Sequence, residues 1–388
     1  MMRSTIIKLL LSIFFAFVTS KSFGQNFEVS ATQAIMIDGE TGSILYQKST
    51  HTKFEPASLT KLMTAELVFH LLDSCALRED QLFHISINAW RTGGAPSRTN
   101  TMFAPVNSDI SVLDLLRGMI IVNGNDAAIA LAEGISGSEE KFADLMNERA
   151  KELGLNSSHF VNSTGLPQNG QYTTASDIVR LSRYIATHYP KYFKIYSEPE
   201  ITWSRITQRN KNPLFALDIG AQGFANAYSD SSGFSTSSVI QNNDRQLFLV
   251  LNGIKKEKDR PTEAAKLLNW GMNAFEFKQV FPKDVIVGYA RVFGGVKSVV
   301  PLSVKEPVDI LMNVEKKPVI SARIIYHGPL DAPISPNVEV GKLQILANKT
   351  VLLEKPVFTA DEVEETGLVG KAKDALYELT IGWLRKYI

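Results

Sequence analysis

Ser58 and Lys61 are the two side chains of this 388-residue sequence with the clearest capacity for chemistry. Both fall in residues 58–72, where an apolar composition and the preceding Pro56 predict a buried helix. A spacing of three places the hydroxyl and the amine on one helix face, within reach of each other. A lysine that is desolvated in a pocket can take the proton of a serine and activate it as a nucleophile. If the helix begins at Ser58, the amide N–H of this residue is unpaired and could help to bind an oxyanion.

The spacing alone is common, so a surface serine and lysine without a joint role would be the simpler interpretation. The neighbouring residues change this. The segment Glu55-Pro56-Ala57-Ser58-Leu59-Thr60-Lys61-Leu62-Met63-Thr64 closely resembles the nucleophile segment of the serine penicillin-binding D-alanyl-D-alanine carboxypeptidases, the low-molecular-mass penicillin-binding proteins. Four further segments resemble this family in the same order, and the likeness covers nearly the whole chain: Asp38–Tyr46, Gly93–Thr99, Asn125–Ala128 and His159–Pro167.

The resemblance implies an α+β fold. A penicillin-recognising domain of the serine-transpeptidase and β-lactamase type would be followed by a small all-β, sandwich-like domain and a C-terminal amphipathic helix. It implies removal of the terminal D-alanine from peptidoglycan stem pentapeptides through an acyl-enzyme on Ser58, with Lys61 as the base. It further implies inhibition by β-lactams and a helix that lies on the outer face of the cytoplasmic membrane. No cofactor is expected.

The second family motif, Ser-x-Asn, is altered in this chain. It corresponds to Asn123-Gly124-Asn125. The resemblance implies that Asn125 hydrogen-bonds the substrate amide and Lys61. Asn123 replaces the serine that passes a proton to the leaving amine, and an amide cannot readily relay a proton at neutral pH.

The third family motif, Lys-Thr-Gly on a strand that faces the nucleophile, is altered as well. Its expected place holds Ala225-Asn226-Ala227, so the cation that would meet the substrate carboxylate is absent. The amide of Tyr228 could still serve as the second oxyanion donor. Arg260 falls where the family often carries an arginine near the carboxylate. A solvated arginine at a helix end is the equally open alternative.

Three functional hypotheses follow from these residues. The first is a periplasmic D-Ala-D-Ala carboxypeptidase, with activity reduced by the two altered motifs. The second is a catalytically silent relative that binds peptidoglycan or a cell-wall partner through the inherited groove. The third is a β-lactamase, which the additional β-rich domain and terminal helix disfavour. Retention of both Ser58 and Lys61 argues against complete silence.

The composition excludes several other classes of protein. Lys and Arg number 41 and Asp and Glu number 40, which excludes a globally basic nucleic-acid-binding protein. Cys75 is the only cysteine, so an internal disulfide and a cysteine-rich zinc site are excluded. The six histidines are scattered without the spacing of helical metal ligands, and no metal site is expected.

Residues 1–24 predict a secretory signal peptide. Arg3 and Lys8 precede an apolar run, residues 9–18, and the small residues of Ser22-Phe23-Gly24 follow it. The run is shorter than the ~20 apolar residues that a spanning helix requires. We therefore favour cleavage after Gly24 over an uncleaved anchor, and expect the mature chain in the periplasm.

Residues 367–388 predict an amphipathic helix. Trp383 and Tyr387 are of types that favour a membrane–water interface, although packing of this helix on its own domain is equally open from the residues alone. The resemblance favours the membrane surface. The acidic stretch Asp361–Glu365 suits a solvated spacer. The apolar face of the helix comprises Leu368, Ala372, Leu376, Leu379, Trp383 and Tyr387.

The elements that position these residues divide the chain into two domains. Residues 27–277 predict a mixed α+β domain with a hairpin, a later strand and several helices. Residues 278–360 predict a small module of short strands. The expected elements of the first domain are strands 34–37, 43–46 and 247–251 and helices 58–72, 112–119, 126–133, 141–153, 176–188 and 262–275. Those of the second domain are strands 285–290, 299–300, 310–312, 322–326 and 343–346.

Overall fold

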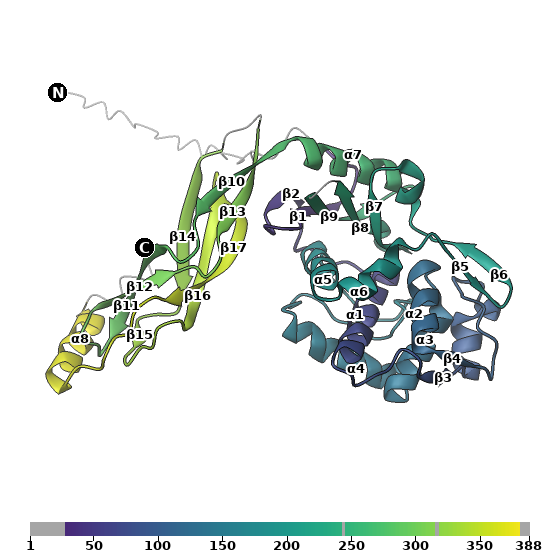
Figure 1. The fold of residues 1–388 in the computed structure, drawn as a ribbon, viewed down its shortest axis with the longest axis horizontal. Coiled ribbons are helices and arrows are strands. Elements are labelled where there is room, and N and C mark those ends of the chain that lie inside the picture. Colours follow the sequence, from purple (N-terminus) through teal and green to yellow (C-terminus); the bar gives the residue numbers. More distant parts are fainter. Residues whose placement is uncertain (1–27, 243–244, 315–317, 381–388) are drawn as a thin grey trace, which may run out of the picture.

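The computed structural model describes residues 28–242, 245–314 and 318–380. Figure 1 shows two lobes: a larger one of helices around a sheet, and a smaller one of strands that ends in a helix. The predicted signal peptide, residues 1–24, and the predicted interfacial residues Trp383 and Tyr387 lie outside the described residues.

A five-stranded antiparallel sheet forms the centre of the larger lobe. Its strand order is β2-β1-β9-β8-β7, so β7 is an edge strand. The predicted hairpin is confirmed, because β1 and β2 pair in antiparallel fashion. The predicted strand 247–251 is part of β9. The bounds are β1 Gln33–Asp38, β2 Ile44–Lys48, β7 Ala221–Ser229, β8 Gly233–Asn242 and β9 Arg245–Ile254.

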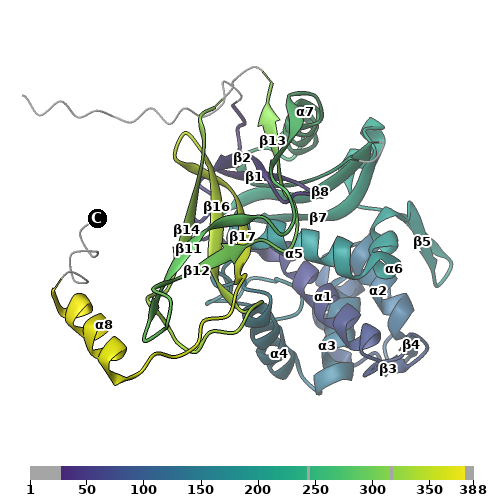
Figure 2. The same ribbon diagram turned by 60° about the vertical axis from the view of Figure 1, so that its left-hand side comes forward.

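Alternate residues of this sheet face different helices, because successive side chains of a strand point to opposite faces. Ile35 and Val250 belong to a large core shared with α1 (Thr60–Asp73) and α5 (Ala175–His188). Met36 and Leu249 belong to a smaller core shared with α7 (Asp259–Asn273). The sheet therefore separates two helical layers, with α7 on one side and α1 and α5 on the other (Figure 2).

The helices predicted in the first domain are confirmed. Serine or threonine hydroxyls accept the hydrogen bond of an amide in the first turn of α2, α4 and α5, which fixes where these helices begin. The bounds of the last predicted helix, 262–275, were wrong: α7 begins at Asp259 and ends at Asn273, and Phe275 begins the next strand, β10. The remaining helices are α2 Val112–Ile121, α3 Asn125–Ser136, α4 Glu139–Glu152 and α6 Pro190–Phe193. Two short pairs of antiparallel strands lie between these helices: β3 Leu82–His84 with β4 Asp109–Ser111, and the hairpin of β5 Glu200–Trp203 with β6 Ile206–Arg209.

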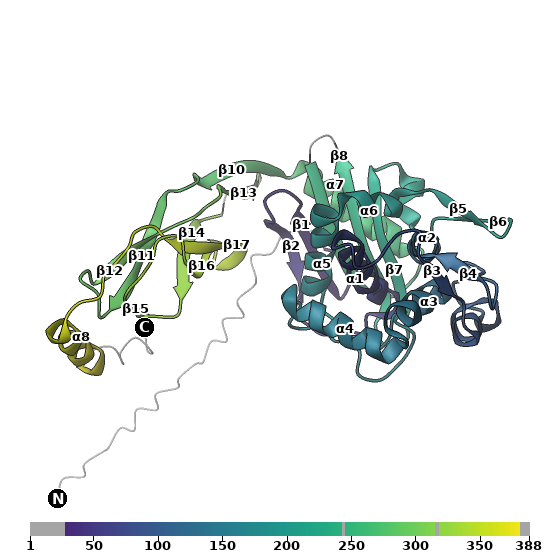
Figure 3. The ribbon, with the colours of Figure 1, turned by 60° about the horizontal axis from the view of Figure 1, so that its bottom comes forward.

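The smaller lobe is built of strands, as predicted. A six-stranded sheet has the order β14-β16-β17-β12-β11-β15, and β10 pairs separately with β13 (Figure 3). Inward-facing residues such as Val300, Ile310 and Val357 form its own core. Its strands are β10 Phe275–Phe281, β11 Ile286–Phe293, β12 Val299–Ser303, β13 Val308–Asn313, β14 Ile320–Tyr326, β15 Leu330–Asp331, β16 Glu339–Ala347 and β17 Thr350–Thr359.

The expectation of a solvated spacer at Asp361–Glu365 was wrong in one respect: the acidic residues are exposed, but the segment is anchored to the smaller lobe. Val363 is 1% exposed, belongs to the core of the smaller lobe and forms a bridge with Ile334. Because the neighbours of Val363 in the sequence are acidic, its burial was not predicted. The chain then enters the last described helix, α8 (Leu368–Thr380).

The polar side of α8 contacts the smaller lobe. The carboxylate of Asp374 accepts a hydrogen bond of 2.8 Å from the amide of Gly294, and Lys371 pairs with Glu365. The apolar side chains of Leu368 and Leu376 are 86% and 64% exposed. No helix within the described ranges is both long enough and apolar enough to cross a bilayer.

Candidate active site

Ser58 lies in a turn of 3-10 helix, Ala57–Leu59, that leads directly into α1. The regular α-helix therefore begins at Thr60, two residues later than predicted. Ser58 is half-buried, and its Oγ is 3.4 Å from Nζ of Lys61. The structure thus brings together the serine and the amine that the sequence singled out.

Lys61 is a buried amine whose surroundings favour its neutral form. Its side chain is 5% exposed, and Nζ donates a hydrogen bond of 2.9 Å to the carbonyl of Thr164. Burial lowers the pKa of Lys61 to about 7, while the negative charges of Asp126 and Glu139 act in the opposite direction. Near neutral pH a substantial fraction of Lys61 can therefore accept the proton of Ser58.

The loop that supplies the Thr164 carbonyl is held under the nucleophile by polar contacts. Thr64 on α1 donates a hydrogen bond of 2.7 Å to the carbonyl of Ser163, and Asn162 Oδ1 accepts one of 2.7 Å from the amide of Gly165. Gly165 has φ +75°, and a Cβ there would lie 1.8 Å from the carbonyl oxygen of Ala57. Only glycine permits this approach of the loop to the turn that carries Ser58.

The second-motif residues lie beside the pair. Asn123 has a backbone φ of +60°, a conformation that asparagine tolerates. Its side-chain nitrogen, Nδ2, is 3.5 Å from the carbonyl oxygen of Asn226. Asn125 is 4% exposed and donates a hydrogen bond of 2.9 Å to Thr99. The hydrogen bond expected between Asn125 and Lys61 does not form among the described residues: Lys61 contacts Ser58 and Thr164 instead, and Asn125 Oδ1 is buried without a partner.

The third-motif residues lie on β7, the edge strand of the sheet. The carbonyl of Asn226 faces Asn123, away from β8. In a strand the N–H and C=O of one residue point to the same side, and those of the residue two positions along do so too. The N–H of Tyr228 therefore points from the same free edge towards the site. The side chain of Tyr228 is 53% exposed, and its hydroxyl donates to Asp230.

Arg260 is buried, which rules out the solvated alternative. It is 8% exposed, lies in the first turn of α7 and pairs with Glu257 at 3.5 Å. Burial lowers its pKa, and Glu257 opposes the shift. Its guanidinium lies 5.8 Å from the ring centre of Phe234, which in turn contacts the ring of Tyr228. Arg260 therefore supports the far side of these rings.

A small pocket of about 30 Å3 borders Lys61, Asn123, Ala225 and Asn226. Sequence reasoning missed several of its lining residues, namely Tyr196 and the triplet Asn210-Lys211-Asn212. The triplet could have been predicted only from its polar composition and its position shortly before the third motif in the sequence. Within the described ranges, no three His, Cys, Asp or Glu side chains gather as a metal site would require.

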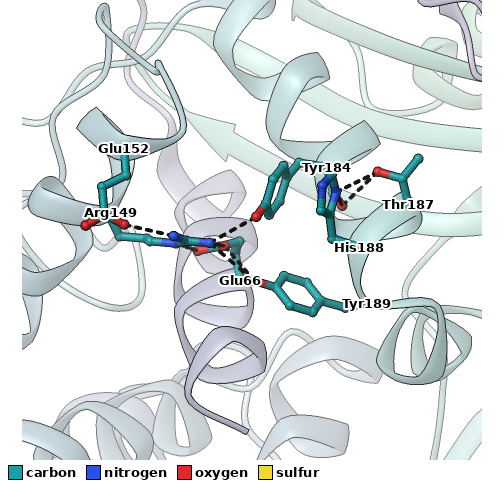
Figure 4. Close-up of polar contacts among 7 residues, drawn as sticks. All are labelled: Glu66, Arg149, Glu152, Tyr184, Thr187, His188 and Tyr189. Carbon is teal, nitrogen blue, oxygen red and sulfur yellow. Dashed lines mark hydrogen bonds and ion pairs between the residues drawn. The ribbon is translucent and has the colours of Figure 1, made fainter. Parts of the chain in front are cut away.

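A buried ion pair anchors the helix that carries Ser58 and Lys61. Glu66, on α1, has a fully buried side chain, and Arg149 on α4 donates to it at 2.9 and 3.1 Å (Figure 4). The hydroxyl of Tyr189 donates to the same carboxylate at 3.2 Å, and Tyr184 accepts from Arg149. Burial raises the pKa of Glu66, and Arg149 counteracts this effect. The cluster fastens α1 to α4 and to the end of α5.

Comparisons with known proteins agree with this geometry. Residues 19–255 match the family model of D-alanyl-D-alanine carboxypeptidases, and residues 275–365 match the model of the C-terminal domain of penicillin-binding protein 5. The D-alanyl-D-alanine carboxypeptidase DacD of Escherichia coli is 32% identical over 350 residues, which cover 89% of this chain and 90% of DacD.

Solved structures resemble both lobes. Penicillin-binding protein 5 of Haemophilus influenzae is 29% identical and gives a TM-score of 0.72, over 88% of this chain and 99% of that one. Penicillin-binding protein 6B of Escherichia coli is 29% identical and gives a TM-score of 0.66, over 86% and 97%. These likenesses confirm the expected fold class, an α+β penicillin-recognising domain followed by a β-rich domain.

Proposed function

The chain belongs to the D-alanyl-D-alanine carboxypeptidase family, and on that basis we propose that it removes the terminal D-alanine from peptidoglycan stem pentapeptides through an acyl-enzyme on Ser58. One observation carries the proposal: Ser58 Oγ lies 3.4 Å from a buried lysine amine whose pKa is about 7. A silent binding protein would not need this pairing of a hydroxyl with a desolvated base, and the comparisons do not favour that alternative.

The chemistry begins when neutral Lys61 takes the proton of Ser58. The serine oxygen then bonds to the carbonyl carbon of the penultimate D-alanine. The N–H groups of Ser58 and Tyr228 are the donors proposed for the oxyanion that forms. The C–N bond to the terminal D-alanine breaks, and the Lys61 ammonium returns its proton to the leaving amine, because the Asn123 amide cannot relay one. Water then hydrolyses the ester, which releases the shortened peptide and restores Ser58.

The test is acylation by a penicillin, followed by mass spectrometry of the intact protein. We expect the mass of the wild type to increase by the mass of the drug, and that of Ser58→Ala to stay unchanged. Ser74→Ala, at an exposed position beyond the other end of α1, is the matched control and should acylate like the wild type. Release of D-alanine from a pentapeptide should likewise depend on Ser58. An unmodified wild type that also leaves the pentapeptide intact would refute the proposal.

Inhibition by β-lactams forms part of the same proposal. Penicillin-binding protein D2 of Listeria monocytogenes, 25% identical over 64% of this chain with TM-scores of 0.58 and 0.56, has been crystallised in cefotaxime-bound and ampicillin-bound forms. A β-lactam carries a strained amide and a carboxylate, as the acyl-D-Ala-D-Ala terminus carries an amide and a carboxylate. The same nucleophile would attack both kinds of molecule.

We also propose that residues 1–24 direct export to the periplasm, and that residues 367–388 hold the mature chain on the outer face of the cytoplasmic membrane. The exposed apolar side of α8, with Leu368, Val369 and Leu376, supports the second part. Mature protein should co-sediment with vesicles of bacterial phospholipid, and a chain ending at residue 366 should stay in solution. Equal co-sedimentation of the two chains would contradict the role of the helix.

A further inference from the structure

We propose that a groove beside the nucleophile binds the positively charged side chain of the residue that precedes D-Ala-D-Ala in the substrate. The inference rests on the proposed function and adds to it the recognition of a further substrate residue. The groove is lined by Glu55, Pro167, Gln168, Asn169, Gly170 and Gln171. Among the described residues, this lining holds one carboxylate and three side-chain amides, but neither Lys nor Arg. A surface of this composition favours a cationic ligand group.

The direction in which the substrate lies along β7 leads to this groove. In the family motif, the cation that meets the terminal carboxylate stands at the position of Ala225. The donor proposed for the penultimate carbonyl is the N–H of Tyr228. Traced from its C-terminus, the substrate therefore runs along β7 from Ala225 to Tyr228. The residue that precedes D-Ala-D-Ala must then lie beyond Tyr228, where β7 ends at Ser229.

Glu55 stands at this end of β7. The turn that follows the strand contacts it twice. Ser231 Oγ donates a hydrogen bond of 2.6 Å to Oε2 of Glu55, and the N–H of Glu55 donates one of 3.0 Å to Ser232 Oγ. Glu55 also precedes Ser58 by three residues, so their Cα atoms are no more than about 11 Å apart. A lysine side chain one residue before the acylated D-alanine can span that distance.

The carboxylate of Glu55 has capacity left for a ligand. It is half-buried and accepts from Ser231, and no cation pairs with it in the part of the chain that the structure describes. A carboxylate can accept about four hydrogen bonds, so most of its acceptor sites stay available. Lys53, two residues before Glu55, is directed elsewhere: its Nζ lies 3.6 Å from the ring centre of Tyr172.

The buried wall of the groove contains a further acceptor. Gln171 is 8% exposed, and its Nε2 donates a hydrogen bond of 3.0 Å to the carbonyl of Leu166. This contact fixes the orientation of the amide and leaves Oε1 of Gln171 buried, without a donor among the described residues. A buried acceptor without a donor is costly. A ligand ammonium, which carries three N–H donors, supplies the kind of group that this wall lacks.

The loop that forms this wall is held in place. Asn162 donates from its side chain to the carbonyl of Leu166 at 3.1 Å and to Oε1 of Gln168 at 3.0 Å. The same asparagine accepts from the amide of Gly165, the residue that approaches the turn of Ser58. The groove and the nucleophile thus share one scaffold. A site that is already formed loses less conformational freedom when a ligand binds, which favours a specific site.

The test compares two peptides that differ in one charge: Nα-acetyl-L-Lys-D-Ala-D-Ala and the same peptide with the side-chain amine acetylated. Binding is measured to Ser58→Ala and to Ser58→Ala with Glu55→Gln, so that turnover is not required. Glutamine keeps an oxygen that can accept from Ser231 and removes the charge. We expect Glu55→Gln to weaken binding of the charged peptide by about 3- to 10-fold, the effect of a partly solvated ion pair, and to leave binding of the acetylated peptide within about twofold.

The matched control is Glu148→Gln, which removes an exposed carboxylate of α4 outside the groove and should change neither affinity. Glu55→Asp, which keeps the charge, should retain more of the preference for the charged peptide than Glu55→Gln. Equal affinities of Ser58→Ala for the two peptides, equal effects of Glu55→Gln on both, or binding of neither would overturn the inference. Penicillin acylation of Ser58 in the wild type then decides separately whether the proposed function stands.

Discussion

Replacing Lys61 with methionine is expected to lower the rate of Ser58 acylation by about 10^4-fold or more, since the serine then has no base within reach. Methionine has a similar length and fills the space of the lysine, so the loss should come from chemistry rather than from a cavity. Acylation by a penicillin, measured by stopped-flow or by intact mass, gives the rate. Lys151→Met, on the exposed face of α4, should acylate like the wild type.

The pH dependence of the same reaction provides a second measure of Lys61. Acylation of the wild type should rise with pH to a plateau, with an inflection near the Lys61 pKa of about 7, because only the neutral amine accepts the proton.

The free energy of unfolding should depend on pH as well. Between pH 7 and the ordinary lysine pKa of 10.5, the unfolded chain binds one more proton than the folded chain, so stability increases with pH relative to Lys61→Met. A flat rate profile, or equal pH slopes for the two proteins, would contradict a neutral Lys61 base.

Arg149→Met is expected to destabilise the larger lobe by about 3–5 kcal/mol, because it leaves the carboxylate of Glu66 buried without its cation. The side chain of Glu66 has no solvent exposure, and Arg149 supplies two of its contacts, at 2.9 and 3.1 Å. For a lobe of this size the loss corresponds to a fall in Tm of roughly 6–20 °C. Chemical denaturation and thermal unfolding would measure it.

The same arginine offers its own control. Glu152 pairs with Arg149 at 2.8 Å, but its side chain is 63% exposed, so Glu152→Ala should cost less than about 1 kcal/mol. Replacing Glu66 and Arg149 together with methionine should cost less than Arg149→Met alone, because no unpaired charge remains buried. If Arg149→Met were no worse than Glu152→Ala, the ion pair would not be what anchors α1.

Local patterns in the sequence were sufficient for much of the fold and for the centre of the site. Apolar composition and the preceding Pro56 located the helix that carries Lys61, and the glycine-containing turn located the first hairpin. The spacing of three was enough to predict that Ser58 and Lys61 meet, because that contact is made within one helical turn. Helix ends were less predictable: α7 ends before Phe275, where pairing with β13 turns the chain into a strand.

Contacts between distant segments could not be predicted in this way. The carbonyl of Thr164 reaches Lys61 across 103 positions, and Arg149 reaches Glu66 across 83. Neither pair leaves a periodic signal in one sequence. Lys211 was missed for the same reason, since it becomes part of the site only when its loop meets β7. The burial of Val363 was not predicted, because its neighbours in the sequence are acidic. Their side chains are exposed, whereas Val363 packs in the apolar core of the smaller lobe.

The side-chain amide of Asn226 donates a hydrogen bond of 3.1 Å to the carbonyl of Lys211, so the strand of the third motif and the loop before it are coupled. Threonine has no amide group, and Asn226→Thr would therefore remove this contact. Substitutions at residues in contact do not add simply. The effect of restoring one residue of the Lys-Thr-Gly motif would thus depend on the residues of the loop, and the three altered positions do not act as independent losses.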